Sequence, residues 1–543
     1  MFITFKFFRP LLVLIAGVCL VSCDSRGSGG IGNSISAGEV RSIDGFGNNP
    51  QFVEAGSSNS LFLRLTDSEY SDGANSPAGA TRPSPRVISN ELMITTEGRK
   101  NAQNLSNYVW LWGQFLDHDI TLTPESKPHE VLQMEIPKGD HYFDPDSTGD
   151  KSMSLNRSRY ASGTGTEAGN PREQVNLITS WIDASNVYGS DQERADWLRT
   201  FQGGKLKTSP GGFLPLNDGS QINAGPAPFS KKMYVAGDVR ANEQVALTAM
   251  HTLFLREHNR LAEDLAITNP EWNDEQIYQR TKKFIGAFMQ SITFNEFLPI
   301  LLGQYAPRAY QGYKPEVNGS IRNEFSTAVF RFGHSMIPEE LLLINPDNSE
   351  RFVALRDVFF RPGKLEELGM EPVLRGFASQ KMEEVDLHVN ENLRNFLFGR
   401  PGSGGLDLAA LNILRGRDHG LPNYNALRSA YGLEPLRHFS EITSNTEIAT
   451  KLSDLYKDIN DVDPWVGLLA EDHLKNLAIG QTLALGLSVQ FSQLRDGDRF
   501  WYENDSNFSS QDIDFIKRSN LLSIITRNTD ITLLKNKNIF VAE

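Results

Sequence analysis

The sequence predicts a mainly α fold, organised as one large helical domain with few short strands. Three segments, at residues 248–265, 279–303 and 474–497, carry apolar residues at the three- and four-residue spacing of helices. Alternating apolar and polar runs bounded by turn residues, which would indicate strands, are scarce. No internal repeat and no Pro- or Gly-rich linker follows residue 45, so we expect residues 46–543 to form one domain.

The N-terminus, residues 1–22, has the pattern of a secretory signal. Lys6 and Arg9 precede the apolar run LLVLIAGVCLV, which is too short to span a membrane. The run ends in LVSC at residues 20–23, which resembles the lipobox of bacterial lipoproteins. That resemblance implies acylation of Cys23 and an exported lipoprotein anchored to a bacterial membrane, on its periplasmic or cell-surface face. Cleavage without acylation is the alternative.

Residues 23–45 begin with a Gly- and Ser-rich stretch that predicts a flexible tether. Cys19 lies in the signal and Cys23 at the acylation position, so the exported chain has no cysteine pair for a disulfide. Its stability must then come from burial, a metal or a cofactor. The chain has 53 basic and 67 acidic residues, a net charge of −14 and no basic run, which disfavours nucleic-acid binding.

The stretch WLWGQFLDHDITLTP at residues 110–124 places polar groups in an apolar helical pattern. Gln114, Asp117 and His118 share one helix face because they lie three or four residues apart, whereas Asp119 points about 100° further round. We therefore expect one helix to direct polar side chains toward two different neighbours.

The segment LITSWIDASNVYGSD at residues 177–191 gathers hard oxygen atoms. Thr179, Asp183 and Ser185, together with backbone carbonyls, would suit Ca²⁺, which takes six to eight oxygen ligands. The same residue types commonly form Asx-turns and helix caps, and this pattern alone favours that structural role.

Two histidines lie in settings that suggest function. His118 lies in QFLDHD, and His334 lies in an apolar segment that runs to Pro338. A histidine satisfied within the core would fit either pattern as well. His251 and His258 are seven residues apart, two turns along one helix face and too far for one zinc site, which disfavours a zinc hydrolase.

Six ordered segments carry a more specific signal. They are WGQFLDHDITLTP, TSWIDASNVYGS, AGDVRANE followed by LTAMHTLFLREHNRLA, FRFGH, LNILRGRDHGLPNYN and LRDGDRFWYEN. Together they resemble the animal-type haem peroxidases of the peroxidase-cyclooxygenase superfamily, in particular its peroxidasin- and lactoperoxidase-like members. The resemblance implies the helical haem peroxidase fold. It also implies an enzyme that reduces hydrogen peroxide through an oxyferryl intermediate and oxidises halide, thiocyanate or small phenolic donors.

The resemblance assigns roles in catalysis and iron ligation. His118 matches the distal histidine that moves the peroxide proton, Gln114 matches its neighbour, and Arg240 matches the arginine that stabilises charge on the breaking O–O bond. His334 matches the ligand of the haem iron, with Asn412 accepting its hydrogen bond. An uncharged partner would make the imidazole a weaker electron donor to iron than a carboxylate partner would.

Further residues would hold a haem b derivative and Ca²⁺. Asp117 and Glu243 match carboxylates that form ester bonds to haem methyl groups, and we expect Glu243 to share a helix face with Arg240. Arg331 and Arg415 fall where family arginines hold haem and its propionates. The calcium ligands that the resemblance implies are Asp119, Thr179, Asp183, Ser185 and the backbone carbonyl of Trp181.

Two departures from the family pattern narrow the function. Gln244 stands where some members carry a methionine linked to haem as a sulfonium, so we expect neither that link nor efficient chloride oxidation. Arg331 stands three residues before His334, where fatty-acid dioxygenases carry a radical-forming tyrosine, which favours a peroxidase over that alternative. A non-catalytic, lipid-anchored ligand- or glycan-binding protein is a further alternative, but it would not need the six ordered motifs.

Overall fold

A computed structural model describes residues 39–543 except residues 96–97, 533 and 535. The predicted signal and Cys23 lie outside the described residues, so the lipid anchor stays a prediction. The tether, expected to reach residue 45, is packed against the domain from Glu39 onward. Arg41 donates to Asp498 at 2.9 Å, and Glu39 pairs with Arg499.

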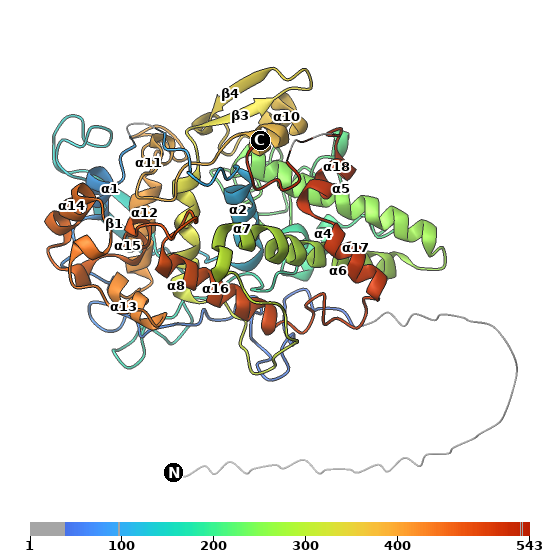
Figure 1. Cartoon of the computed structure of the whole chain (residues 1–543), viewed down its shortest axis with the longest axis horizontal. Coiled ribbons are helices and arrows are strands. Elements are labelled where there is room, and N and C mark those ends of the chain that lie inside the picture. Colours follow the sequence, from blue (N-terminus) through green and yellow to red (C-terminus); the bar gives the residue numbers. More distant parts are fainter. Residues whose placement is uncertain (1–38, 96–97, 533, 535) are drawn as a thin grey trace, which may run out of the picture. The chain divides into compact units, whose positions relative to one another are not determined.

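The described fold is mainly α, as predicted, with two short antiparallel hairpins (Figure 1). Strand β1 (Val131–Glu135) pairs with β2 (Ser152–Asn156), and β3 (Glu340–Ile344) pairs with β4 (Glu350–Ala354). The α-helices are α1 (Pro85–Leu92), α2 (Tyr108–Ile120), α3 (Ser185–Tyr188), α4 (Gln192–Leu198), α5 (Val245–Thr268), α6 (Asp274–Ile292), α7 (Leu298–Leu302), α8 (Asn323–Thr327), α9 (Gly363–Leu368), α10 (Met370–Ser379), α11 (Glu391–Arg394), α12 (Leu408–Asp418), α13 (Tyr424–Ala430), α14 (Thr446–Tyr456), α15 (Pro464–Ala470), α16 (Gln481–Asp496), α17 (Ser510–Arg518) and α18 (Leu521–Asn528).

Helix α2 lies among the other helices near the middle of the described domain (Figure 1). It contacts α3, α5 and the 3₁₀ segment η4 (Val329–Met336). Trp110, Leu111 and Trp112 project at successive steps of about 100° around α2 and are all buried, as expected for a helix that is apolar around most of its circumference. This burial places the polar residues of α2 inside the protein.

The helix predicted at residues 248–265 is confirmed as α5, but it begins at Val245. Gln244 is its N-cap, with an extended backbone and a side chain that accepts a hydrogen bond from Ala246 N. Arg240 and Glu243 therefore lie in the preceding turn, where Glu243 N donates to Arg240 O at 2.9 Å. The expectation that these two residues share a helix face is wrong, because the cap starts the helix after them.

The apolar segment at residues 279–303 forms α6, a π-helical turn η2 (Thr293–Phe297) and α7. Pro299 has no N–H and its ring crowds the preceding turn, a conflict that a wider π turn relieves. The stretch Asp274–Tyr305 is apolar enough to cross a membrane, but 72% of its most apolar window is buried in the fold. It therefore has the character of a core helix.

The helix predicted at residues 474–497 forms only in its second part, as α16. Residues 474–480 make a turn in which Leu474 N donates to Ile479 O and Asn476 has a left-handed φ of 64°. Gly480 then caps α16, and a Cβ there would approach Glu471 Oε2 to 2.3 Å. Apolar spacing could not reveal this turn, because its leucines are spaced as in a helix.

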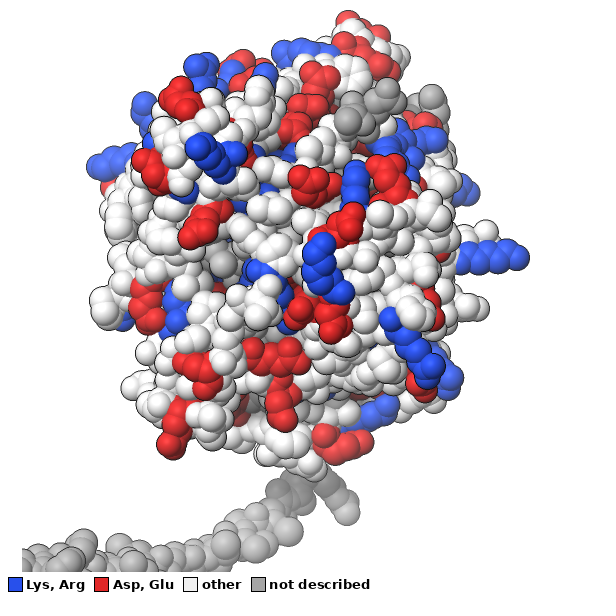
Figure 2. Space-filling view, turned by 90° about the vertical axis from the view of Figure 1, so that its left-hand side faces the viewer, with Lys and Arg blue, Asp and Glu red and all other residues white. Residues whose placement is uncertain are grey.

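Charged residues of both signs are interspersed on the face shown in Figure 2. That face carries no area of basic side chains alone.

Candidate active site

A cavity of about 360 Å³ lies between α2, the turn before α5, η4 and α12. Apolar side chains from these elements form much of its wall, among them Phe332, Phe359 and Leu411. Nine residues predicted from the sequence line this one cavity: Gln114, Asp117, His118, Arg240, Glu243, Arg331, His334, Asn412 and Arg415. The motifs that carry them are spread over about three hundred residues of sequence.

His118 is held rigidly on α2 with only 3% of its surface exposed. Its Nε2 lies 3.8 Å from Glu243 Oε2, and its Nδ1 lies 3.7 Å from Asp238 Oδ1. Burial, and then the nearby Arg240 cation, hold the pKa of His118 well below its usual value. The imidazole is therefore neutral at neutral pH and can accept a proton.

Arg240 is clamped by hydrogen bonds on several sides. Its Nε and Nη2 donate to the two oxygens of Asp238, both at 2.9 Å, and Nη2 also donates to Thr121 O at 2.8 Å. Its Nη1 lies 3.3 Å from Asp117 Oδ2. Burial opposes ionisation of Asp238, but the Arg240 guanidinium holds the pKa of Asp238 well below its usual range. Arg240 thus keeps its charge and position at the cavity wall.

Asp238 is a site residue that the sequence analysis missed. It is 2% exposed and bridges the two catalytic candidates, since it binds Arg240 and faces Nδ1 of His118. His118 Nδ1 has no hydrogen-bond partner among the described residues. The sequence signal that could have identified Asp238 is its position in the motif AGDVRANE, two residues before Arg240.

Replacing Asp238 by Asn is expected to slow a reaction in which His118 accepts a proton by about 10-fold or more, a usual cost of removing a group that orients a site residue. The imidazolium that forms during proton transfer would lose its nearby negative charge, and Arg240 would lose its ion pair. Rapid-mixing absorbance measures this step. Glu263→Gln, at a carboxylate 63% exposed on α5, is the matched control. An unchanged rate in Asp238→Asn would contradict a positioning role.

The amide of Gln114 links two residues of the turn before α5. Its Nε2 donates to Glu243 Oε2 at 2.9 Å, and its Oε1 accepts from Gln244 Nε2 at 3.0 Å. Gln244 therefore both caps α5 and orients Gln114. Burial raises the pKa of Glu243 to about 7 and that of Asp117 to about 6.

His334 contacts Asn412 as expected, but the direction of the hydrogen bond is the opposite. The amide Nδ2 of Asn412 lies 2.7 Å from His334 Nδ1, while Asn412 Oδ1 accepts from Arg331 Nη1 at 3.0 Å. Arg331 thus occupies the oxygen that was expected to accept from His334. Burial, and then Arg331, lower the pKa of His334 to about 3, so its ring is neutral over the physiological range.

The two cavity arginines differ in their partners. Arg415 Nη1 pairs with Asp418 Oδ2 at 2.9 Å. Arg331 donates only to neutral oxygens, of Ser326 at 3.1 Å and of Asn412, and among the described residues no carboxylate lies within 4.0 Å of it. Burial, and then Arg415, lower the pKa of Arg331 to about 10. A buried cation with no carboxylate within 4.0 Å, in a cavity that also contains two neutral histidines and an apolar wall, fits a flat cofactor with acidic side chains.

The predicted calcium ligands also come together, on the other side of α2. Ser185 Oγ donates to Asp119 Oδ1 at 3.1 Å, and Thr179 Oγ1 donates to Asp183 Oδ1 at 3.1 Å. Trp181 is fully buried beside them. Burial, and then Asp183, raise the pKa of Asp119 well above its usual value. Among the described residues no group of three His, Cys, Asp or Glu could hold a metal, so a cation here would need the hydroxyls and carbonyls as well.

The chain is similar to known proteins over most of its length. A family model described as animal haem peroxidase matches residues 40–540. The chain is similar to Peroxinectin A of Dictyostelium discoideum, with 38% identity over 480 residues that cover 86% of this chain and 89% of that protein.

Two solved structures are similar in fold. Peroxidase A from Dictyostelium discoideum matches with a TM-score of 0.85 and 34% identity, covering 93% of this chain and 99% of that chain. A fatty acid α-dioxygenase from Arabidopsis thaliana matches with a TM-score of 0.76 and 21% identity, and the match covers 92% of this chain and 85% of that chain. At that identity the second likeness concerns the fold alone.

Proposed function

The chain belongs to the animal haem peroxidase family, and from this premise we propose which residues carry out its reaction. It is a haem peroxidase that reduces hydrogen peroxide to water while oxidising small donors. One observation supports the assignment of residues most strongly: His118, Arg240 and His334 line a single cavity. Haem, when bound, supplies the iron that takes up the oxidising equivalents of the peroxide.

We infer that His334 and Arg331 hold the haem. The neutral imidazole of His334 would ligate iron, and the unpaired guanidinium of Arg331 would bind a propionate. Arg415, which is already paired with Asp418, would contribute a weaker charge. When Arg331 turns toward a propionate, the amide of Asn412 is free to present its oxygen to His334.

His118 would act as the acid and base of the reaction. Its neutral Nε2, which faces the cavity beside Glu243, accepts a proton from hydrogen peroxide and returns it to the oxygen that departs as water. Arg240 stabilises the negative charge that develops while the O–O bond breaks, and Asp238 keeps both groups in position.

Covalent attachment of the haem through Asp117 and Glu243 is a further expectation, because both carboxyls line the cavity. Treatment with peroxide should leave haem bound to the protein after acid extraction, and mass spectrometry should find it on peptides that contain these residues. The double variant Asp117→Ala/Glu243→Ala should release it, whereas Glu263→Ala at the surface should not. Complete extraction of haem from the peroxide-treated parent would refute the ester links.

The side chain of Gln244 bears on which electron donors the enzyme oxidises. It offers no thioether sulfur for a sulfonium link, and its amide is already engaged with Gln114 and Ala246. We therefore propose thiocyanate, the heavier halides and phenols, rather than chloride, as donors.

We also propose that Ca²⁺ binds Asp119, Thr179, Asp183, Ser185 and the Trp181 carbonyl. The donor set supports this, because Asp119 and Asp183 are both buried, and Arg41, which lies 4.0 Å from Asp183, is shared with Asp498. Such an ion would restrain Asp119 and, through the backbone, its neighbour His118. Metal analysis of the dialysed protein tests the proposal, and absence of calcium would contradict it.

A further inference from the structure

An apolar groove of about 560 Å³ lies on the surface between residues 216–233 and the start of α9. Its floor is formed by Leu216, Pro226, Ala227, Met233, Phe360 and Pro362. Leu216 leaves 46% of its surface exposed, and the neighbouring Phe229 leaves 55% exposed. The groove therefore offers a contiguous apolar surface of the kind that binds apolar groups.

The rim of this groove is strongly cationic. Lys231, Lys232, Arg361 and Lys364 line it, against one carboxylate, that of Glu367. Glu367 pairs with Lys364 at 2.6 Å. Within the described part of the chain, Lys231, Lys232 and Arg361 have no carboxylate within 4.0 Å. Three unpaired cations around an apolar floor, in a chain of net charge −14, favour an anion that also has an apolar body.

The groove adjoins the active-site cavity through two aromatic rings. Phe360 lines the groove, Phe398 lines the cavity, and their ring centroids lie 5.2 Å apart. Phe360 N also donates to Glu243 O at 3.2 Å. Both phenylalanines have a left-handed φ, 48° and 68°, which bulky side chains rarely adopt and which is common at ligand-binding sites. Phe398 is 50% exposed, so a second ring can stack against this pair.

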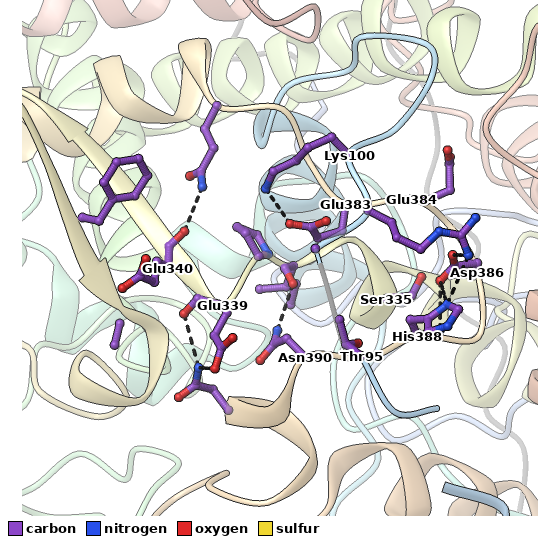
Figure 3. A pocket seen from close by; sticks show the side chains of 18 of the residues that line it. Thr95, Lys100, Ser335, Glu339, Glu340, Glu383, Glu384, Asp386, His388 and Asn390 are labelled. Atoms are coloured by element: carbon purple, nitrogen blue, oxygen red, sulfur yellow. Dashed lines mark hydrogen bonds and ion pairs between the residues drawn. The ribbon is translucent and has the colours of Figure 1, made fainter. Parts of the chain in front are cut away.

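A second cleft, of about 440 Å³, has the opposite charge balance, with more carboxylates than cations. It lies beside the β3–β4 hairpin and residues 383–392 (Figure 3). Lys100 pairs there with Glu383 at 2.5 Å, and Arg99 pairs with Asp386 at 2.7 Å. Five carboxylates line this cleft, against the three cations of Arg99, Lys100 and Arg356, so it does not favour an anion. Of these two clefts, only the groove has an excess of cations, and its Phe360 contacts Phe398 of the active-site cavity.

We propose that the groove binds phenolic carboxylates and presents them as electron donors at the mouth of the haem cavity. The carboxylate would bind Lys231, Lys232 and Arg361, and the phenol ring would lie against Phe360 and Phe398. This inference rests on the proposed peroxidase function. In the overall reaction two phenols each lose one electron and one proton, one hydrogen peroxide becomes two waters, and two phenoxyl radicals leave.

A pair of donors that differ only in charge tests the proposal: 4-hydroxyphenylacetate and its neutral amide. The double variant Lys231→Gln/Lys232→Gln should raise KM for the acid by about three- to tenfold, the usual worth of two exposed ion pairs. KM for the amide, kcat for both donors and the rate with peroxide should not change. Added salt should reduce the preference of the wild type for the acid. Lys475→Gln, at an exposed lysine outside the groove, is the matched control.

Equilibrium dialysis of 4-hydroxyphenylacetate against the holoprotein without peroxide separates the two proposals. If the protein oxidises no donor but the double variant still binds the acid several-fold more weakly than the wild type does, the groove proposal is supported and the peroxidase assignment is wrong. If both phenols are oxidised but the variant binds the acid as tightly as the wild type, the groove proposal is overturned. Equal changes in KM for the acid and the amide would overturn it as well.

Discussion

Replacement of His118 by Ala is expected to slow the reaction of the haem-bound protein with hydrogen peroxide by about 10²- to 10⁴-fold, the usual contribution of a positioned general base. The ring is buried at 3% exposure and its pKa lies well below the usual value, so Nε2 is free to take the proton at neutral pH. Rapid mixing with limiting peroxide, followed by absorbance, measures this step without any donor.

The control for His118→Ala must separate catalysis from haem binding. The variant should keep its haem, because His334 lies on η4 and is unchanged. His129→Ala, at a histidine whose side chain is 65% exposed, should behave as the wild type. A rate for His118→Ala within about twofold of the wild type would mean that another group moves the proton.

Replacement of His334 by Ala is expected to remove stable ligation of the haem iron. No other imidazole of the described chain lines the cavity except that of His118. The Soret band should shift and weaken, and peroxide turnover should be lost. Because the deleted ring leaves space beside Asn412, added imidazole should restore part of the spectrum. His141→Ala, at an exposed histidine, should change nothing. An unchanged spectrum and activity in His334→Ala would place the iron ligand elsewhere.

The cavity residues could be predicted because they lie in motifs that keep their order along the chain. Helical periodicity alone does not indicate that His118 is functional rather than His251, which is also buried, on α5. The ordered motifs separate the two, and the structure places His118 and His334 on the cavity but not His251. The mainly α class was likewise predictable, because long apolar helices such as α5 carry a strong periodic signal.

Other features depend on contacts between distant segments and could not be predicted. The start of α5 after Glu243 follows from the cap made by Gln244, a residue whose propensity gives little warning of it. Asp238 acquires its role only when α2 brings His118 to within 3.7 Å of it. The orientation of the Asn412 amide depends on Arg331, which reaches it from η4.

The central claim, that this cavity holds a haem which reacts with peroxide under the control of His118, is tested most directly by one rate. The purified holoprotein and an equal concentration of free haemin are each mixed with hydrogen peroxide at neutral pH, and the bimolecular rate constant is measured from the haem absorbance. We predict that the rate constant of the protein exceeds that of free haemin by about 10²-fold or more, because a positioned base contributes at least that factor. A protein that binds no haem, or a rate constant equal to that of free haemin, would contradict the claim.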